Sequence, residues 1–325
     1  MSAVEKFDSD LLPSDSEASE TLAPRPAVAV EKYASDLLPS NPEASEPLAP
    51  TPDVVGSIAE ITAEIALLGM PNDAAQGTRF VRIDRARLRA AGFVPEEAQE
   101  RRFADQYRRI KRPILMQVQI LTAAHAPGAR FVMMASALPG DGKTFTSINL
   151  AMSIARERDV SVLVMDADVA KPHISRIFGI DKEPGLLDAL ADDEMDIESL
   201  VLPTDVEGLS LLSAGRHHEA ATELLASARM HLVLARLTAR DPRRIVLLDS
   251  PPLLLSSESR ALVQIAGQVV LVVRAGGTPK QAVQEAIGYI GEGKPLGLIL
   301  NQSLLALSEG YYGYGSYGDA NPPAS

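Results

Sequence analysis

The sequence predicts an α/β fold with a doubly wound, mostly parallel sheet. From Arg130 onward, short apolar runs alternate with helical stretches. The runs are continuously apolar rather than alternating, which is typical of strands covered by helices on both faces. Strand–helix alternation of this kind is typical of a doubly wound domain, in which ligands bind at the carboxyl ends of the strands. The expected strands are FVMMA, VSVLVMD, LSLLSA, RIVLLD, QVVLVV and LGLIL.

The chain is expected to divide into four parts. Its formal net charge is -12, and residues 1–60 carry twelve Asp or Glu against three Lys or Arg, so the acidity belongs to an extension. Much Ser and Pro with few aromatics is typical of segments that bury too little apolar area to fold. The parts are a disordered acidic extension over 1–55, a helical linker and oligomerisation segment over 56–119, the α/β domain over 120–305, and a flexible Tyr- and Gly-rich tail over 306–325.

Composition excludes several classes of function. The chain has no cysteine, so disulfides, thiol catalysis and thiolate metal sites are excluded. No basic face is evident, so no nucleic-acid partner is expected. The N-terminus lacks a basic run followed by an apolar core, and no apolar stretch approaches membrane-spanning length, so a cytoplasmic location is expected.

An internal repeat opens the chain. Val4–Pro24 recurs as Val30–Pro50, and 16 of 21 aligned positions are identical. Two copies fall short of the three or more that a stacked repeat fold needs. The repeat is either a duplicated docking peptide or a duplicated linker, and the linker interpretation is favoured because short motifs often match by chance.

A helical pattern precedes the expected sheet, from Ile58 to Gln119. Its part from Ala98 to Pro113 is basic, which most often indicates a solvated helix face. Pro113 is expected to end this helix or to kink it, because proline disfavours helical geometry in the residue before it.

The first expected strand runs into a phosphate-binding loop, ALPGDGKT, followed by a helix. Gly140 and Gly142 let the loop fold tightly enough for backbone N–H groups to converge on phosphate, and the helix dipole adds to this attraction. Lys143 is expected to reach the β- and γ-phosphates, and Thr144 to place its hydroxyl on Mg²⁺. This order of strand, loop and helix predicts a P-loop NTPase fold. The expected nucleotide-binding residues are Pro139, Gly140, Asp141, Gly142, Lys143, Thr144 and Phe145.

Two further strands end in aspartates. Asp166 and Asp168 follow the second strand two residues apart, so they suit either a Mg²⁺ site or a base for an attacking hydroxyl, or else cap the next helix. Asp249 ends RIVLLDSPP, and a single aspartate delivered beside a P-loop is the Walker B arrangement that holds Mg²⁺.

Together these segments resemble the bacterial tyrosine kinases, the polysaccharide-biosynthesis tyrosine autokinases. That family has a Walker A of the form xxPGxGK[ST], then DxDxxxP, then DSPP or DTPP. Here the three read Ala137–Thr144, Asp166–Pro172 and Leu247–Pro252. The resemblance covers about Gln106 to Gly318, and DADVAKP is most similar to the branch associated with exosortase-type exopolysaccharide systems.

The resemblance extends to a helix and to the tail. Asp105, Arg108 and Lys111 match the family's Glu-x-x-Arg-x-x-Arg helix, which implies an oligomer interface and a possible ring. The tail EGYYGYGSYG resembles the family's phosphorylated tyrosine cluster, which one subunit presents to the site of its neighbour. The alternative is a low-complexity tail that associates non-specifically. The implied phosphoacceptors are Tyr311, Tyr312, Tyr314 and Tyr317.

The resemblance also assigns roles within the site. It implies ATP and Mg²⁺, with Thr144, Asp249 and Asp166 around the metal, Lys143 on phosphate, Asp166 as the preferred base and Asp168 orienting the metal's surroundings. Asn301 matches a position that reads adenine in related proteins. The chain departs from the family at Ala170-Lys171, where the family often has two basic residues. The carboxylate that the family has after Walker B is matched by Glu258.

The expected function is therefore an ATP-dependent protein-tyrosine autokinase regulating exopolysaccharide synthesis or export. The implied partners are further copies of the chain, a separate membrane polysaccharide co-polymerase or chain-length protein that holds it at the inner membrane, and a tyrosine phosphatase. Two alternatives stay open: an ATPase switch of the partition or site-selection type, and a non-catalytic nucleotide-binding scaffold.

Overall fold

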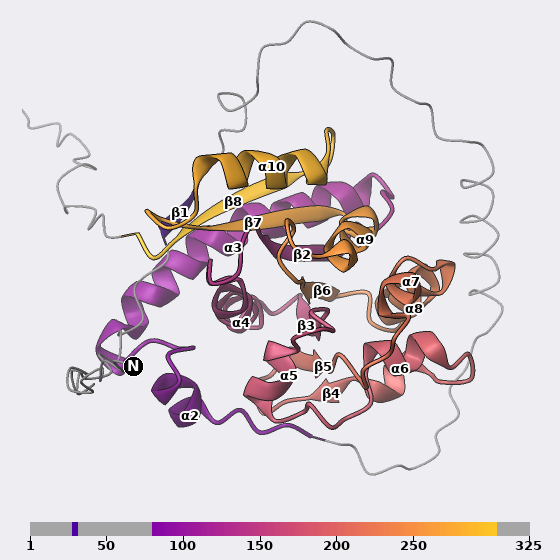
Figure 1. Cartoon of the computed structure of the whole chain (residues 1–325). Coiled ribbons are helices and arrows are strands. Elements are labelled where there is room, and N and C mark those ends of the chain that lie inside the picture. The colour runs from indigo at the N-terminus through magenta and orange to yellow at the C-terminus, as the bar shows by residue number, and fades with distance from the viewer. Residues whose placement is uncertain (1–27, 32–79, 304–325) are drawn as a thin grey trace, which may run out of the picture.

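One eight-stranded sheet organises the computed structural model, which describes residues 28–31 and 80–303 (Figure 1). The strand order is β1-β8-β7-β2-β6-β3-β5-β4. The six strands from β8 to β5 are parallel, and β1 and β4 pair antiparallel at the edges. The strands are β1 (Val28–Glu31), β2 (Phe131–Ser136), β3 (Ser161–Asp166), β4 (Leu202–Pro203), β5 (Leu209–Leu212), β6 (Arg244–Asp249), β7 (Gln268–Arg274) and β8 (Leu296–Asn301). The predicted doubly wound, mostly parallel sheet is confirmed, and all six expected strands are present.

Helices cover both faces of this sheet. Successive side chains of a strand point to opposite faces, so β2 sends Met133 into one core and Met134 into the other. This is why its sequence reads as continuously apolar. Helices α2 to α5 lie on the Met134 side and α6 to α10 on the Met133 side. The helices are α2 (Arg85–Ala90), α3 (Glu100–Ala123), α4 (Lys143–Ile154), α5 (His173–Phe178), α6 (Leu186–Ala191), α7 (Ala221–Leu225), α8 (Ala228–Arg240), α9 (Ser257–Ile265) and α10 (Lys280–Ile290), with 3₁₀ turns at η1 (Glu97–Gln99) and η2 (Ile197–Leu200).

The basic helix α3 passes through Pro113 and continues to Ala123. Of the two alternatives for the proline, an end of the helix is therefore wrong, and a kink stays a prediction. Ile110, Ile114 and Val118 are buried on one side of α3, and this burial continues on both sides of the proline. The apolar contact with the sheet therefore sustains a helix that lacks one backbone hydrogen bond.

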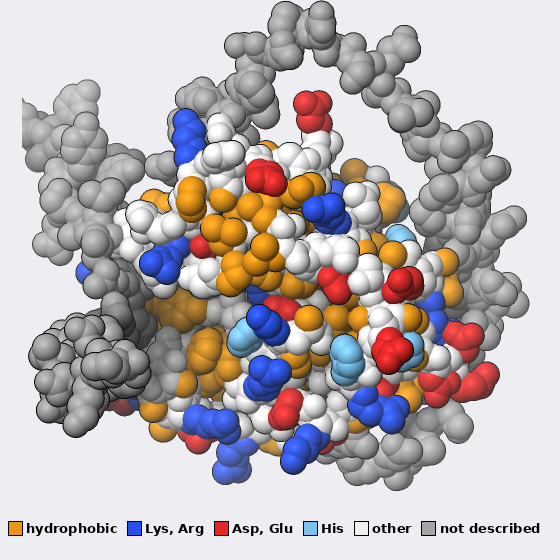
Figure 2. Space-filling view, in the orientation of Figure 1, with side chains coloured by type: hydrophobic (Ala, Val, Ile, Leu, Met, Phe, Trp, Pro, Cys, Tyr) orange, Lys and Arg blue, Asp and Glu red, His pale blue; other side chains and the backbone are white. Residues whose placement is uncertain are grey.

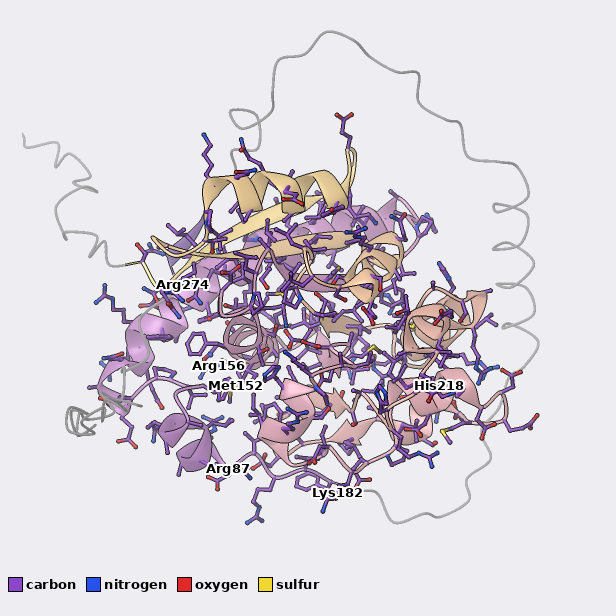
Figure 3. The ribbon with its side chains drawn as sticks, in the orientation of Figure 1. Arg87, Met152, Arg156, Lys182, His218 and Arg274 are labelled. Carbon is purple, nitrogen blue, oxygen red and sulfur yellow. The ribbon has the colours of Figure 1, made fainter. Side chains whose placement is uncertain are left out.

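A small cavity of about 90 Å³ lies between α2, α3 and the end of α4. Phe103 and Tyr107 of α3 line it together with Met152 and Arg156. Figure 3 shows the last two side chains lying between α4 and α2. The basic helix thus has one face in the core and one in solvent.

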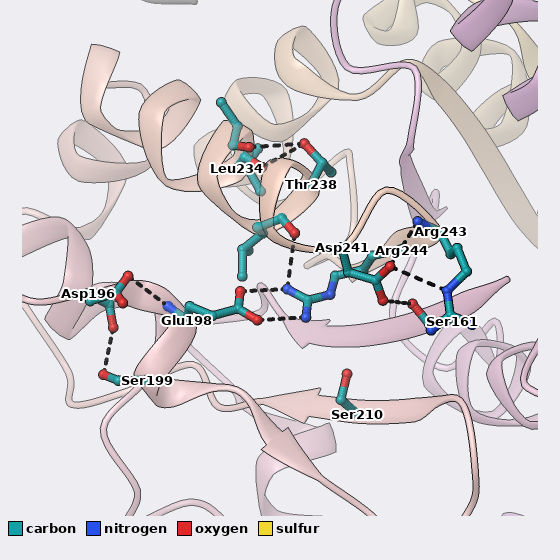
Figure 4. A network of polar contacts seen from close by, with 12 residues as sticks. Ser161, Asp196, Glu198, Ser199, Ser210, Leu234, Thr238, Asp241, Arg243 and Arg244 are labelled. Carbon is teal, nitrogen blue, oxygen red and sulfur yellow. Dashed lines mark hydrogen bonds and ion pairs between the residues drawn. The ribbon is translucent and has the colours of Figure 1, made fainter. Parts of the chain in front are cut away.

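An ion-pair network fixes the amino ends of β3 and β6 (Figure 4). Arg244, at the start of β6, donates two hydrogen bonds to the Glu198 carboxylate, at 2.6 and 2.7 Å, and a third to the Leu237 carbonyl at 3.0 Å. Ser161, at the start of β3, donates to Asp241 at 2.6 Å. These contacts join the sheet to η2 and to the end of α8.

Several expectations concern residues outside the described part of the chain. Of the extension expected to be disordered, only Val28–Glu31 is described, and it forms β1. The rest of residues 1–55 and the tail with its four tyrosines lie outside the described residues. Among the residues that the structure describes, no helix is both long and apolar enough to cross a membrane.

Candidate functional site

The phosphate-binding loop lies where predicted, between β2 and the amino end of α4. Gly140 and Gly142 have φ angles of 83° and 89°, which disfavour any residue with a Cβ. At Gly142 a Cβ would lie 1.9 Å from the Asn301 side-chain nitrogen. This position therefore requires glycine for both backbone conformation and space.

Two neighbouring elements hold the loop in shape. The buried Asp141 carboxylate accepts hydrogen bonds from the Leu138 N–H at 3.1 Å and from the Thr278 hydroxyl at 2.7 Å. Asn301, at the end of β8, donates its side-chain N–H to the Asp141 carbonyl at 2.9 Å. The loop is thus pre-organised before any ligand binds, which reduces the entropy cost of binding.

Asp249 lies beneath the loop, fully buried at the end of β6. Its carboxylate accepts hydrogen bonds from the hydroxyls of Thr144 and Ser147 at 2.9 and 2.8 Å, and the Lys143 Nζ lies 3.0 Å away. The two residues predicted to bind phosphate and Mg²⁺ are therefore already in contact with the predicted Walker B aspartate.

Asp166 is the direct neighbour of Asp249, because β3 and β6 are parallel and in register at this pair. One oxygen of Asp166 accepts the N–H and the hydroxyl of Ser175, both at 2.7 Å. Its other oxygen, Oδ1, is buried and accepts no hydrogen bond from the described residues. Burial first, and then the Asp249 charge, raise the pKa of Asp166 to about 7.

Asp168 differs from Asp166 because its side chain lines a cavity. This cavity of about 510 Å³ is open at the loop, and it is also lined by Lys143, Lys171 and Glu258. Burial raises the pKa of Asp168, while the Lys143 ammonium and the Lys171 N–H oppose the shift. Figure 2 looks onto this face of the molecule, where Lys, Arg and His side chains gather around α5.

Glu258 also lines this cavity. It accepts hydrogen bonds from the Ser256 hydroxyl at 2.6 Å and from the Thr222 hydroxyl at 3.1 Å. Burial raises its pKa, but these hydrogen bonds outweigh burial and lower the pKa overall. The segments around Thr222 and Glu258, distant in sequence, therefore meet in space.

The oxygen donors at this site fit a magnesium ion. No group of three His, Cys, Asp or Glu among the described residues forms a metal-binding cluster by itself. Mg²⁺, however, is held in nucleotide sites by one or two carboxylates together with water and phosphate oxygens. The unpartnered Oδ1 of Asp166, beside Asp249 and Thr144, supplies an oxygen of the kind that this ion takes.

Other predicted residues lie away from the cavity. Asn301 is buried against the loop and does not line the cavity, so its contact with adenine stays a prediction. Asp105 and Arg108 form an exposed ion pair of 2.8 Å on α3. Lys111 is buried within the chain, where it donates to the Ser153 carbonyl at 2.7 Å and lies 2.6 Å from Glu157.

Sequence reasoning missed Ser147, Ser175 and Thr278. Ser147 lies one helical turn after Lys143, so both face Asp249 from one side of α4. That spacing was a usable signal. Ser175, in α5, and Thr278, in the loop before α10, have no such signal, because only tertiary packing brings them to the site.

The fold and the site together define a P-loop NTPase-like nucleotide-binding domain. Residues 129–294, just over half of the chain, match the AAA domain family. The tyrosine-protein kinase YwqD of Bacillus subtilis is 33% identical over 187 residues, which are 56% of this chain and 77% of YwqD. The chain belongs to the AAA domain family and, within it, to the bacterial tyrosine-kinase group.

A longer relative and a solved structure agree with this assignment. EpsB of Ralstonia nicotianae is 35% identical over 191 residues, which are 58% of this chain but 25% of EpsB, so the chain matches about a quarter of that relative. The kinase domain of the Escherichia coli tyrosine kinase ETK superposes with a TM-score of 0.53 and 26% identity, over 66% of this chain and 80% of that domain.

Proposed function

We propose that this protein is an ATP-dependent protein-tyrosine kinase. The observation that carries the proposal is the convergence of Lys143, Asp249 and Asp166 beneath a glycine-dependent phosphate loop. Phosphoryl transfer depends mainly on positioning and on charge stabilisation. A buried ammonium beside two carboxylates supplies both, and the kinase names of the relatives support the choice of tyrosine as acceptor.

Each residue of the site has a part in this proposal. The loop amides and Lys143 bind the phosphates of ATP, and Lys143 leaves Asp249 to do so. Thr144, Asp249 and Asp166 are the residues that would hold Mg²⁺. The ion, when bound, would neutralise the charge that develops on the phosphate oxygens.

The proton of the acceptor tyrosine is assigned to Asp168 rather than to Asp166. Asp168 lines the cavity, whereas Asp166 is fully buried and has one oxygen held by Ser175. A general base must lie within hydrogen-bond reach of the hydroxyl that it deprotonates. The raised pKa of Asp168 makes its carboxylate a stronger base than an exposed aspartate.

The acceptors in this proposal are Tyr311, Tyr312, Tyr314 and Tyr317, presented by a second copy of the chain. Asp105 and Arg108, exposed on α3, are available for contact between copies, while Lys111 stabilises the fold of each copy. Control of exopolysaccharide synthesis or export, attachment to the inner membrane through a separate co-polymerase, and reversal by a phosphatase are further parts of this proposal, and the resemblance of the sequence motifs supports them.

The test is phosphotyrosine formation by the purified chain with Mg²⁺ and ATP. Lys143→Met should lower the rate by about 10³-fold or more, because the ammonium acts on the transferring phosphate. Lys182→Met, on an exposed lysine after α5, is the matched control and should leave the rate unchanged. Phosphotyrosine that persists in Lys143→Met would refute the proposed site.

A deletion of residues 310–325 separates the alternatives. We expect it to abolish most phosphotyrosine while nucleotide binding stays intact. Binding and hydrolysis without any phosphotyrosine in the full chain would instead indicate the ATPase switch, and binding without either reaction would indicate the scaffold.

A further inference from the structure

The start of the second repeat copy, together with the two residues before it, supplies an edge strand of the sheet. β1 pairs antiparallel with β8, with Val30 opposite Ile299 and Glu31 opposite Leu298. Figure 1 shows β1 beside β8 at one end of the sheet. Without β1, the outer backbone groups of β8 would be unpaired, and its Leu300 is already an exposed apolar side chain. An uncovered edge of this kind is a template for pairing with another strand.

The last two residues of β1 begin the second copy of the repeat, and its first two residues directly precede that copy. Aligning the two copies places Ala29, Val30 and Glu31 on Ala3, Val4 and Glu5, so three of the four β1 residues recur unchanged. The fourth, Val28, is replaced by Ser2. Edge-strand pairing uses backbone N–H and C=O groups, so this replacement is compatible with it.

We propose that Ser2–Glu5 is a second edge strand for β8 and that the two repeat copies compete for this edge within one chain. The occupant is thus a segment of the chain itself, bound by backbone hydrogen bonds. The proposal gives the duplication a function that is independent of any reaction at the phosphate loop.

Chain length predicts how the two copies compete. The continuously described chain begins at Phe80, and the connection to it from Glu5 is about one and a half times as long as the connection from Glu31. Both connections are far longer than the width of a domain, so both copies can reach the edge. Because loop closure scales with roughly the 3/2 power of length, the first copy should be only about twofold less effective than the second.

The edge strand also supports the candidate site. β8 ends at Asn301, which donates to the Asp141 carbonyl of the phosphate loop. Its amide also fills the space beside Gly142. A strand that closes β8 therefore stabilises the element that holds the loop in shape.

Hydrogen exchange of the β8 amides in the full chain tests the proposal. Adjacent strand residues point their N–H groups to opposite sides, so a pair of prolines removes a donor on the β8 side in any register. The variant A29P/V30P removes the second copy as a strand, and A3P/V4P removes the first. If the second copy occupies the edge about twice as often as the first, it supplies about two thirds of the protection of the β8 amides. Exchange should then become about threefold faster in A29P/V30P and about 1.5-fold faster in A3P/V4P.

The quadruple variant, which combines all four substitutions, should accelerate exchange at least tenfold, because no strand then closes the edge. A18P/A44P places prolines at equivalent positions of both copies outside these segments and should leave exchange unchanged. The proposal fails if A29P/V30P alone exchanges as fast as the quadruple variant, or if the quadruple variant exchanges like the wild type. It also fails if protection in A29P/V30P rises with protein concentration, since the strand then comes from a second copy.

Discussion

At the amino ends of β3 and β6 the buried Arg244 guanidinium and the Asp241 carboxylate both have partners, whereas at the carboxyl ends two carboxylates lie side by side. Arg244 begins β6 and makes a two-bond ion pair with Glu198. At the far end of the same two strands, Asp166 and Asp249 lie side by side, and both are close to the Lys143 ammonium. One oxygen of Asp166 has no partner among the described residues.

This difference separates stabilising residues from reactive ones within the same pair of strands. Burial of like charges is unfavourable, and proteins tolerate it mainly where a ligand or a reaction uses it. The amino-end network is complete without any ligand. The carboxyl-end pair is relieved by a bound cation or by a proton on Asp166, which is the physical reason to expect Mg²⁺ there.

The largest expected effect follows from removing one charge at the carboxyl end. Asp249→Asn keeps the shape of the side chain but weakens its hold on a metal ion and on the Thr144 hydroxyl. We expect the rate of phosphotyrosine formation per folded molecule to fall by about 10²- to 10³-fold. The measurement is a phosphotransfer assay over a range of Mg²⁺ concentrations.

Asp241→Asn is the matched control at the amino end, where Asp241 accepts the Ser161 hydroxyl. It should leave the rate per folded molecule unchanged. If Asp249→Asn retains more than about a tenth of the activity, the metal role of Asp249 is wrong.

A smaller effect, this time on stability, is expected from Arg244→Met. Arg244 is 8% exposed, so its loss leaves the Glu198 carboxylate and the Leu237 carbonyl without their donor. Removing one partner of a largely buried pair should lower the free energy of unfolding by about 3 kcal/mol. Urea denaturation measures this, and activity per folded molecule should not change.

Arg243→Met is the neighbouring control. The Arg243 side chain is 63% exposed and lies 3.6 Å from Asp241, so its loss should cost less than about 0.5 kcal/mol. Equal losses of stability in the two variants would show that the amino-end network has no special role.

The central strands and the phosphate-binding loop could be predicted from the sequence alone. Six continuously apolar runs predicted the parallel sheet because strands buried on both faces leave no polar positions. The edge strands β1 and β4 escaped prediction because they are short and pair on one side only. The prediction that the helix ends at Pro113 failed because the burial of Ile110 and Ile114 outweighs the preference of proline against the helix interior.

Within the site, the sequence predicted which residues meet but not what surrounds each of them. Lys143, Thr144 and Asp249 are in contact, as strand order and motif spacing implied. The roles of Asp166 and Asp168 could not be separated by sequence, because burial and access to the cavity distinguish them. Thr278 comes from the loop before α10 and Ser175 from α5, and the position of both depends on tertiary packing.

The smallest expected effect is a pH dependence of stability caused by Asp166. Its pKa is about 7 in the folded chain and 3.8 as the ordinary value, so between these values the folded state binds the extra proton. The contribution is therefore fully present below pH 3.8 and is lost as pH rises through 7. Between about pH 5 and pH 7 the free energy of unfolding should fall by about 2 kcal/mol from this group.

Asp166→Asn isolates this contribution, because the amide is neutral at every pH. Subtracting the urea-denaturation profile of the variant from that of the wild type, both without Mg²⁺, should show this decline and cancel the titration of other groups. Saturating Mg²⁺ and nucleotide should flatten the wild-type profile, since a cation stabilises the charged carboxylate. If the difference in the free energy of unfolding does not change with pH without Mg²⁺, Asp166 is ionised throughout this range. The carboxyl ends of the two strands would then differ from the amino ends only by the unpartnered Asp166 oxygen.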